Sequence, residues 1–238
     1  MVADGKRVVQ NLQRFWDRRG RLFPNILGLG ALFSGAALVF HILTGFSLRY
    51  GLLLVASLLV LAIVIGLVRL PAQRRRLLLQ MVGVGILSGI LATASYDSSK
   101  FILSQLDPSP YNPFELNRMF GVLLIGASAP QPLIYIAGTG FHVLNGISFA
   151  VAFCFLFGRR GVLAGVLWGV FLETFQLTLY PGWLDIKFYQ EFVTISSLSH
   201  LVYGAVLGTC CRYGLQRIAP LTNGSRMPKR PRASGARP

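Results

Sequence analysis

Long apolar stretches, separated by shorter polar segments, run through most of the chain. At a rise of about 1.5 Å per residue, such stretches are long enough to cross a hydrocarbon core of roughly 30 Å as α-helices. They cover residues 26–48, 51–68, 77–96, 133–157, 161–180 and 192–211. The first is too long for the apolar core of a signal peptide, and five more follow it. The pattern therefore predicts an all-α integral membrane bundle of six transmembrane helices.

The composition places the chain in the same class, with 53% hydrophobic and 13% charged residues. A formal net charge of +15 would favour a nucleic-acid partner in a soluble protein. Here, however, lysines and arginines cluster before the first stretch, in alternate connections and after the last stretch. The remaining connections and stretch ends hold Arg49, Lys100, Arg118 and Lys187. The positive-inside rule then predicts that both termini are cytoplasmic, and that the charge attracts anionic lipid headgroups rather than nucleic acid.

One apolar segment does not fit the six-helix pattern. Residues 119–128 are apolar but too short to span a bilayer, and Pro130 and Pro132 prevent the segment from continuing as a regular helix. A crossing at this point would also move Arg159 to the outer side. We therefore predict that residues 107–132 form one external loop, re-entrant or interfacial, which covers an outward-facing pocket as a lid.

The two ends of the chain differ from its middle. Residues 1–24 form a basic leader in which apolar positions and arginines take opposite helical faces, as in an interfacial amphipathic helix. The transmembrane domain is predicted over residues 25–212, and the basic tail 213–238 is predicted to be disordered. The cysteines match neither a disulfide framework nor a zinc spacing and are expected to be buried thiols; they are Cys154, Cys210 and Cys211.

All the histidines of the chain stand in one sequence frame, with a glycine four residues later and a small residue four residues earlier. The frames are His41–Gly45, His142–Gly146 and His200–Gly204, preceded by Ala37, Gly138 and Ser196. Positions four apart stack on one helical face, so each histidine is expected beside a closely packed helix. Because ionisable side chains in a bilayer usually face the bundle interior, the three histidines predict one buried polar site.

Glu173 belongs to the same predicted layer. The helical rise places it, like the three histidines, about 10–14 Å below the outer surface. It also continues a row of small residues at intervals of four, Gly161, Gly165 and Gly169, which predicts a tightly packed neighbour. Asn145 lies near this layer, and Asp97 stands at the outer end of its stretch. Asp97 is expected either to pair with Lys100, three residues away, or to close the top of the pocket.

Several chemistries use these residue types. His41, His142, His200 and Glu173 would suit Zn or Fe with an open position that activates water, although no fixed-spacing ligand motif is present. Histidines on facing helices also suit haem, and the same groups suit a proton relay in a transporter. A metal-free pocket for an isoprenoid or lipid would use Glu173 or Asp97 as general acid. The remaining alternative is structural, with hydrogen bonds that specify the bundle.

Three motifs give a resemblance as well. The segment Ala92–Lys100, the frame His142–Gly146 and the segment Leu198–Gly208 resemble motifs of a family of uncharacterised prokaryotic multi-pass membrane proteins. The likeness covers roughly residues 80–210, so His41 lies outside it. It implies a multi-pass protein of a bacterial or archaeal cytoplasmic (inner) membrane, and it carries no activity to transfer.

From these observations we hypothesise a membrane-embedded protein with an outward-facing His/Glu pocket, a metal-assisted enzyme for a lipid-like or apolar substrate. The catalytic candidates are Glu173, Asp97 and Asn145. The alternative is a proton-coupled transporter or a haem-binding membrane component. The sequence leaves the oligomeric state open.

Overall fold

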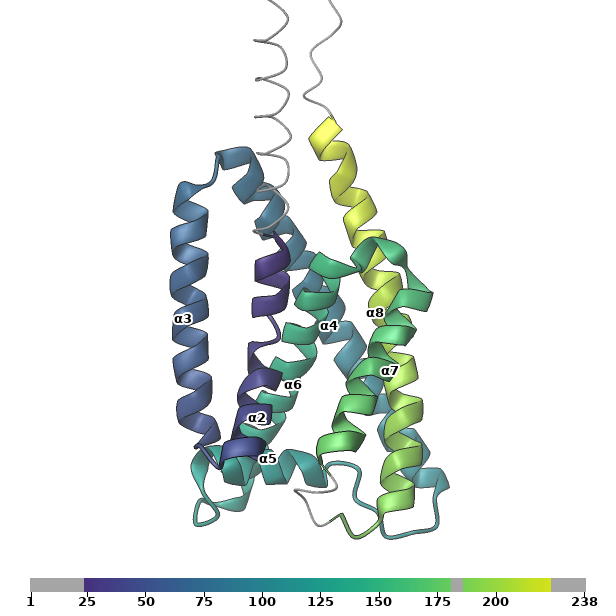
Figure 1. The fold of residues 1–238 in the computed structure, drawn as a ribbon. Coiled ribbons are helices and arrows are strands. Elements are labelled where there is room, and N and C mark those ends of the chain that lie inside the picture. Colours follow the sequence, from purple (N-terminus) through teal and green to yellow (C-terminus); the bar gives the residue numbers. More distant parts are fainter. Residues whose placement is uncertain (1–23, 181–185, 224–238) are drawn as a thin grey trace, which may run out of the picture.

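The computed structural model describes residues 24–180 and 186–223, with side chains up to residue 218. Regular structure in these ranges is helical throughout. A short helix, Pro24–Gly30, comes first. It is followed by α2 (Phe33–Thr44), α3 (Leu48–Arg69), α4 (Ala72–Leu106), α5 (Glu115–Ile125), α6 (Gln131–Leu156), the 3-10 turn η1 (Gly158–Arg160), α7 (Val162–Leu179) and α8 (Tyr189–Asn223). The long helices stand side by side as a bundle, while α5 lies across one end of it (Figure 1).

The six predicted apolar stretches coincide with helices. Within the described ranges, five helices are long and apolar enough to cross a membrane. A sixth is obtained if Pro24–Gly30 and α2 form one span, although they meet at a bend of 45°. The all-helical class is therefore confirmed, and so is the succession of helices long and apolar enough to cross a membrane. The predicted first helix, 26–48, ends earlier than expected because Gly45 takes φ 72° and its N–H donates to the carbonyl of His41.

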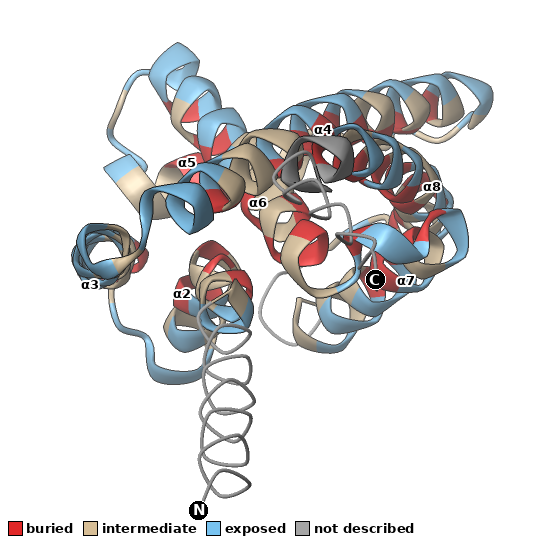
Figure 2. Ribbon diagram, turned by 90° about the horizontal axis from the view of Figure 1, so that it is seen from above, coloured by how far each residue is buried: buried red, intermediate tan, exposed pale blue. Residues whose placement is uncertain are grey.

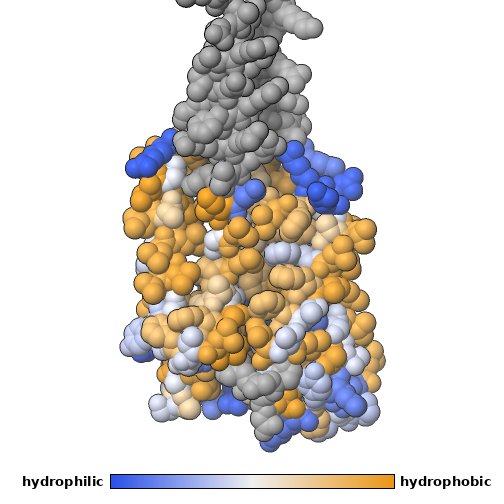
Figure 3. Space-filling view, in the orientation of Figure 1, coloured by the Kyte–Doolittle hydropathy of each residue, from blue (hydrophilic) through white to orange (hydrophobic). Residues whose placement is uncertain are grey.

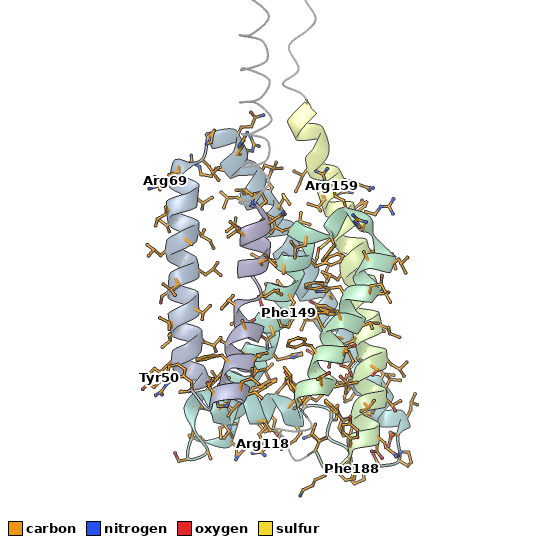
Figure 4. The ribbon with its side chains drawn as sticks, in the orientation of Figure 1. Tyr50, Arg69, Arg118, Phe149, Arg159 and Phe188 are labelled. Carbon is orange, nitrogen blue, oxygen red and sulfur yellow. The ribbon has the colours of Figure 1, made fainter. Side chains whose placement is uncertain are left out.

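The connections sort to two ends of the bundle. Arg69 and Arg159 mark one end, whereas Tyr50, Arg118 and Phe188 mark the other (Figure 4). Between the ends, the visible side of the molecule is largely hydrophobic, and hydrophilic residues gather at the two ends (Figure 3). The basic connection after α3 thus lies at the same end as η1, in agreement with the alternation of charge along the sequence.

The interior has two parts. One core cluster joins α4, α6, α7 and α8 around Phe153, Trp168 and Leu207, and a second joins α2, α3, α5 and α6 around Leu48 and Phe120. Helices α7 and α8 approach most closely where glycines face each other. A β-carbon on Gly204 would collide with the carbonyl oxygen of Gly165, so the two backbones touch because neither residue has a side chain.

Helix α3 is apolar yet hardly buried. It stands at the edge of the bundle with exposed residues around most of its circumference (Figure 2), and almost none of its apolar stretch is fully buried. Helix α5, with 11 residues, is too short to span a bilayer, as predicted for the segment 119–128. Helix α8 continues past the predicted domain end at residue 212 to Asn223. The leader, apart from residue 24, and residues 224–238 of the tail lie outside the described residues.

Candidate functional site

An imidazole and a carboxylate meet between α4 and α6. Nε2 of His142 lies 2.9 Å from Oδ1 of Asp97, and the two side chains are 19% and 28% exposed. Of the two roles expected for Asp97, the structure therefore pairs it with a neighbouring helix rather than with Lys100. The carboxylate of Asp97 orients the imidazole and leaves Nδ1 as the second polar atom of the ring.

A second imidazole–carboxylate pair joins α8 to α7. Nδ1 of His200 lies 2.7 Å from Oε2 of Glu173, whose side chain is 6% exposed. Two hydroxyls of α8 complete the carboxylate: Ser196 donates to Oε2 at 2.9 Å, and Ser197 donates to Oε1 at 3.1 Å. Gln176 in turn donates to the Ser196 hydroxyl at 3.0 Å. A buried carboxylate is costly unless it is paired and hydrogen-bonded, and here both oxygens have donors.

The row of small residues on α7 explains how Glu173 reaches these donors. β-Carbons on Gly165 and Gly169 would collide with the carbonyl oxygens of Gly204 and His200, respectively. Glu173 continues this row by one further turn. The tight approach of α7 to α8 thus brings the carboxylate within hydrogen-bonding distance of Ser196 and Ser197, as the spacing of four had indicated.

Tyr96 connects the two pairs. Its ring centroid lies 5.6 Å from that of His142 and 4.8 Å from that of His200, and its hydroxyl is 3.4 Å from Oγ of Ser196. The tyrosine is 5% exposed. Asp97, His142, Tyr96, His200 and Glu173 therefore form one continuous array of titratable groups across four helices.

A small cavity of about 80 Å³ lies against this array, lined in part by His142, His200 and Asn145. Residues from α5, Leu116, Asn117 and Phe120, also line it. The loop predicted over 107–132 thus contributes a helix that covers the polar site. Neither Asp97 nor Glu173 lines the cavity, so each carboxylate stands behind its imidazole.

A larger apolar cavity of about 500 Å³ adjoins the first, between α2, α6 and α7. The two cavities share lining residues: Asn145, Phe149, Leu172, Gln176, Tyr180 and His200. Phe149 lies at mid-height of the bundle (Figure 4), so the apolar space extends from the polar site toward the bundle centre. The side chains of Phe171 and Phe175, which line the apolar cavity, are exposed, so this space lies at the lateral surface of the bundle.

A third cavity, of about 360 Å³, lies at the end of the bundle near α5. Its lining includes Tyr111 and Leu116, and Leu116 also lines the polar cavity. The pKa of Tyr111 is raised, chiefly by burial and further by the negative charge of Glu173. The loop before α5 therefore lies within electrostatic range of the buried site.

His41 does not join the other histidines. Its Nδ1 lies 2.7 Å from the carbonyl oxygen of Phe46, and it lines neither the polar nor the apolar cavity. The physical reason is the end of α2, because Gly45 terminates the helix instead of forming a packing face.

In the part of the chain that the structure describes, no three His, Cys, Asp or Glu side chains are grouped to hold a metal ion. The predicted ligand set, His41, His142, His200 and Glu173, is therefore not assembled there. The cavity lining contains two imidazoles, those of His142 and His200, that could bind Zn, Fe or haem.

Two contributions to the site were not anticipated. Ser196 was expected only as a small residue for helix packing, but its hydroxyl bonds Glu173 and Gln176. Lys100 was expected to pair with Asp97, but it is 3% exposed and lines the polar cavity. Its Nζ lies 5.5 Å from the ring centroid of Tyr96 and 5.9 Å from that of Phe114. The sequence signal for this role was that Lys100 closely follows the apolar stretch 77–96, where a lysine is unusual.

Comparison with family models, curated proteins and solved structures finds no match to this chain. The class is set by the fold alone, an all-helical bundle whose apolar helices are compatible with a multi-pass membrane protein. A histidine held by a carboxylate is a common general acid or base, and this site has two such histidines facing one cavity.

Proposed function

We propose that this chain is an integral protein of a prokaryotic cytoplasmic membrane, with six crossings and both termini inside. Helix α3 supports this, because an apolar helix with so few fully buried residues is stable in lipid but not in water. The gathering of basic residues at the end marked by Arg69 and Arg159 supports the orientation. With this orientation, α5 and the polar cavity lie in the outer half of the membrane.

We further propose that the protein is an enzyme that carries out acid–base chemistry on the polar end of a lipid-like substrate. The observation that carries this is the pair of joined cavities. The small cavity has imidazoles and amides, the large one is apolar and opens toward the bilayer, and His200 lines both. A molecule with a polar head and an apolar chain matches this combination.

His200 takes the central role in the proposed chemistry. Nδ1 of His200 lies 2.7 Å from Oε2 of Glu173 and 3.0 Å from the carbonyl oxygen of Ser196, to which it donates. Its Nε2 is therefore the nitrogen available to accept a proton from, or return one to, a group in the cavity. Glu173 orients the imidazole and stabilises its protonated form. His142, held by Asp97, is the complementary acid or base, and Asn145 positions the substrate head.

The test is a conversion assay with the purified protein in liposomes made from a total bacterial lipid extract, analysed by liquid chromatography and mass spectrometry. We expect one lipid class to be depleted and a product to appear. Glu173→Gln should lower the rate by about 100-fold or more, the range for loss of an acid–base group. The matched control is Glu191→Gln, a carboxylate in the first turn of α8 that lines none of the cavities. Conversion that survives in Glu173→Gln would refute the proposed mechanism.

Proton-coupled transport is a second candidate, favoured by the continuous array from Asp97 through Tyr96 to Glu173. The same liposomes separate the two. A transporter would change the luminal pH, reported by a pH-sensitive dye, when a solute gradient is imposed, and it would leave the lipids chemically unchanged. An enzyme would convert lipid without such a proton flux.

A further inference from the structure

The lining of the polar cavity contains a positively charged side chain but no carboxylate. The two carboxylates of the site lie behind His142 and His200, outside the lining. Lys100 lies in the lining and is only 3% exposed, and within the described ranges no carboxylate forms an ion pair with its Nζ. A buried ammonium group without a direct anionic partner is costly, so a ligand that brings negative charge would be stabilised here.

Two further residues of the lining carry a buried polar atom without a hydrogen-bond partner. Oγ1 of Thr93 and Oδ1 of Asn145 are buried and form no hydrogen bond with the described residues. Thr93 is 3% exposed and lies seven residues before Lys100 on the same face of α4. Buried polar groups are normally hydrogen-bonded, so these atoms indicate a ligand that supplies both an acceptor and a donor.

From these contacts we propose that the cavity binds a phosphate monoester at the end of a lipid. Its phosphoryl oxygens would accept hydrogen bonds from Lys100 and Thr93, and the hydroxyl of the monoanion would donate to Asn145. A carboxylate has no such hydroxyl. The cavity of about 80 Å³ holds only a small head group, and the apolar cavity of about 500 Å³ takes the chain. This inference rests on the proposed lipid pocket and names its substrate class.

The test measures binding of fluorescent phosphatidic acid to the full-length protein in a non-ionic detergent. Phosphatidylcholine, diacylglycerol and inorganic phosphate serve as competitors. Phosphatidic acid should compete at least tenfold better than either of the other lipids. Lys100→Met should weaken phosphatidic acid binding by about tenfold or more, because a charge-assisted hydrogen bond is lost. Arg49→Met, an exposed arginine at the same end of the bundle, should have no effect.

Since Lys100→Met replaces an unpaired buried ammonium by an apolar group, its melting temperature should not fall. If that variant nevertheless fails to fold, Thr93→Val tests the same site and should weaken binding several-fold. Unchanged phosphatidic acid binding in folded Lys100→Met, or in Thr93→Val, would overturn the proposal.

A further test asks whether the bound phosphate belongs to a lipid or is free inorganic phosphate. It does so by filling the apolar cavity. Ala36 lines it, so Ala36→Trp should abolish phosphatidic acid binding and leave inorganic phosphate binding unchanged. Ala62→Trp, at an exposed position of α3 outside this cavity, is the control. If diacylglycerol competes as well as phosphatidic acid, the phosphate site is refuted but the lipid pocket stands. If only inorganic phosphate binds, and Lys100→Met removes it, the lipid pocket is refuted.

Discussion

His142 on α6 and Asp97 on α4 are 45 residues apart in the chain, yet Nε2 and Oδ1 lie 2.9 Å apart across the helix interface. The contact fixes the orientation of one imidazole and connects α6 to the helix that carries Tyr96 and Lys100. A helix interface with charged partners of this kind is expensive in a bilayer unless the partners serve a function. Substitutions at such interhelical contacts should therefore separate functional partners from structural ones.

The first prediction concerns Asp97 itself. Asp97→Asn keeps the size of the side chain and a hydrogen-bonding oxygen, but it removes the charge that stabilises protonated His142. We expect lipid conversion to fall by about tenfold to 100-fold, with little change in melting temperature. Asp107→Asn, which alters a carboxylate in the loop after α4, should retain the activity of the parent. Full activity in Asp97→Asn would mean that the contact is structural.

The second prediction concerns the hydroxyl of Ser196. Its loss in Ser196→Ala would leave Oε2 of Glu173 and the amide of Gln176 each with one bond fewer in a buried setting. We expect a loss of stability of roughly 1–3 kcal/mol, measured by thermal unfolding in detergent. For comparison, Ser95→Ala removes a hydroxyl that donates to Leu91 of its own helix, and it should change stability by less than about 0.5 kcal/mol.

The third prediction concerns the glycine contact between α7 and α8. Gly204→Ala places a methyl group against the carbonyl of Gly165, so the helices must separate. We expect destabilisation of about 1–3 kcal/mol or more, because tightly packed interfaces do not accept an extra carbon. In Gly140→Ala the new methyl group meets nothing within 4 Å, and higher helix propensity should raise stability by about 0.5–1 kcal/mol. Equal melting temperatures for the two variants would contradict the packing described.

The fourth prediction concerns orientation in the membrane. In a variant without Cys154, Cys210 and Cys211, a cysteine at Pro110 should react with a membrane-impermeant maleimide added to intact cells. A cysteine at Ala72 should react only after the membrane is opened, because it belongs to the end marked by Arg69. Labelling of position 72 alone in intact cells would reverse the proposed orientation.

Much of the helical framework results from local sequence. An apolar segment of about 20 residues satisfies its backbone polar groups only as a helix, so the six stretches could be located without knowing their neighbours. The row Gly161, Gly165 and Gly169 likewise marked the packed face of α7, because residues four apart share one helical face. The segment 119–128 was predicted not to span from its short length, the prolines that follow it and the charge pattern, and α5 is short as expected.

The composition of the site depended on tertiary structure. The shared spacing of histidine and glycine placed His41 with His142 and His200. The same spacing, however, leads to two different structures. Gly146 packs against Thr93, whereas Gly45 adopts a left-handed conformation and ends its helix. Likewise, Asp97 had a local partner available in Lys100 and pairs instead with His142. The sequence by itself determined which segments are helical and which helix faces are small. How each helix is rotated against its neighbours decided that Asp97 meets His142, that Ser196 and Ser197 meet Glu173, and that Lys100 faces a cavity. That rotation results from packing between segments far apart in the chain, and no local pattern encodes it.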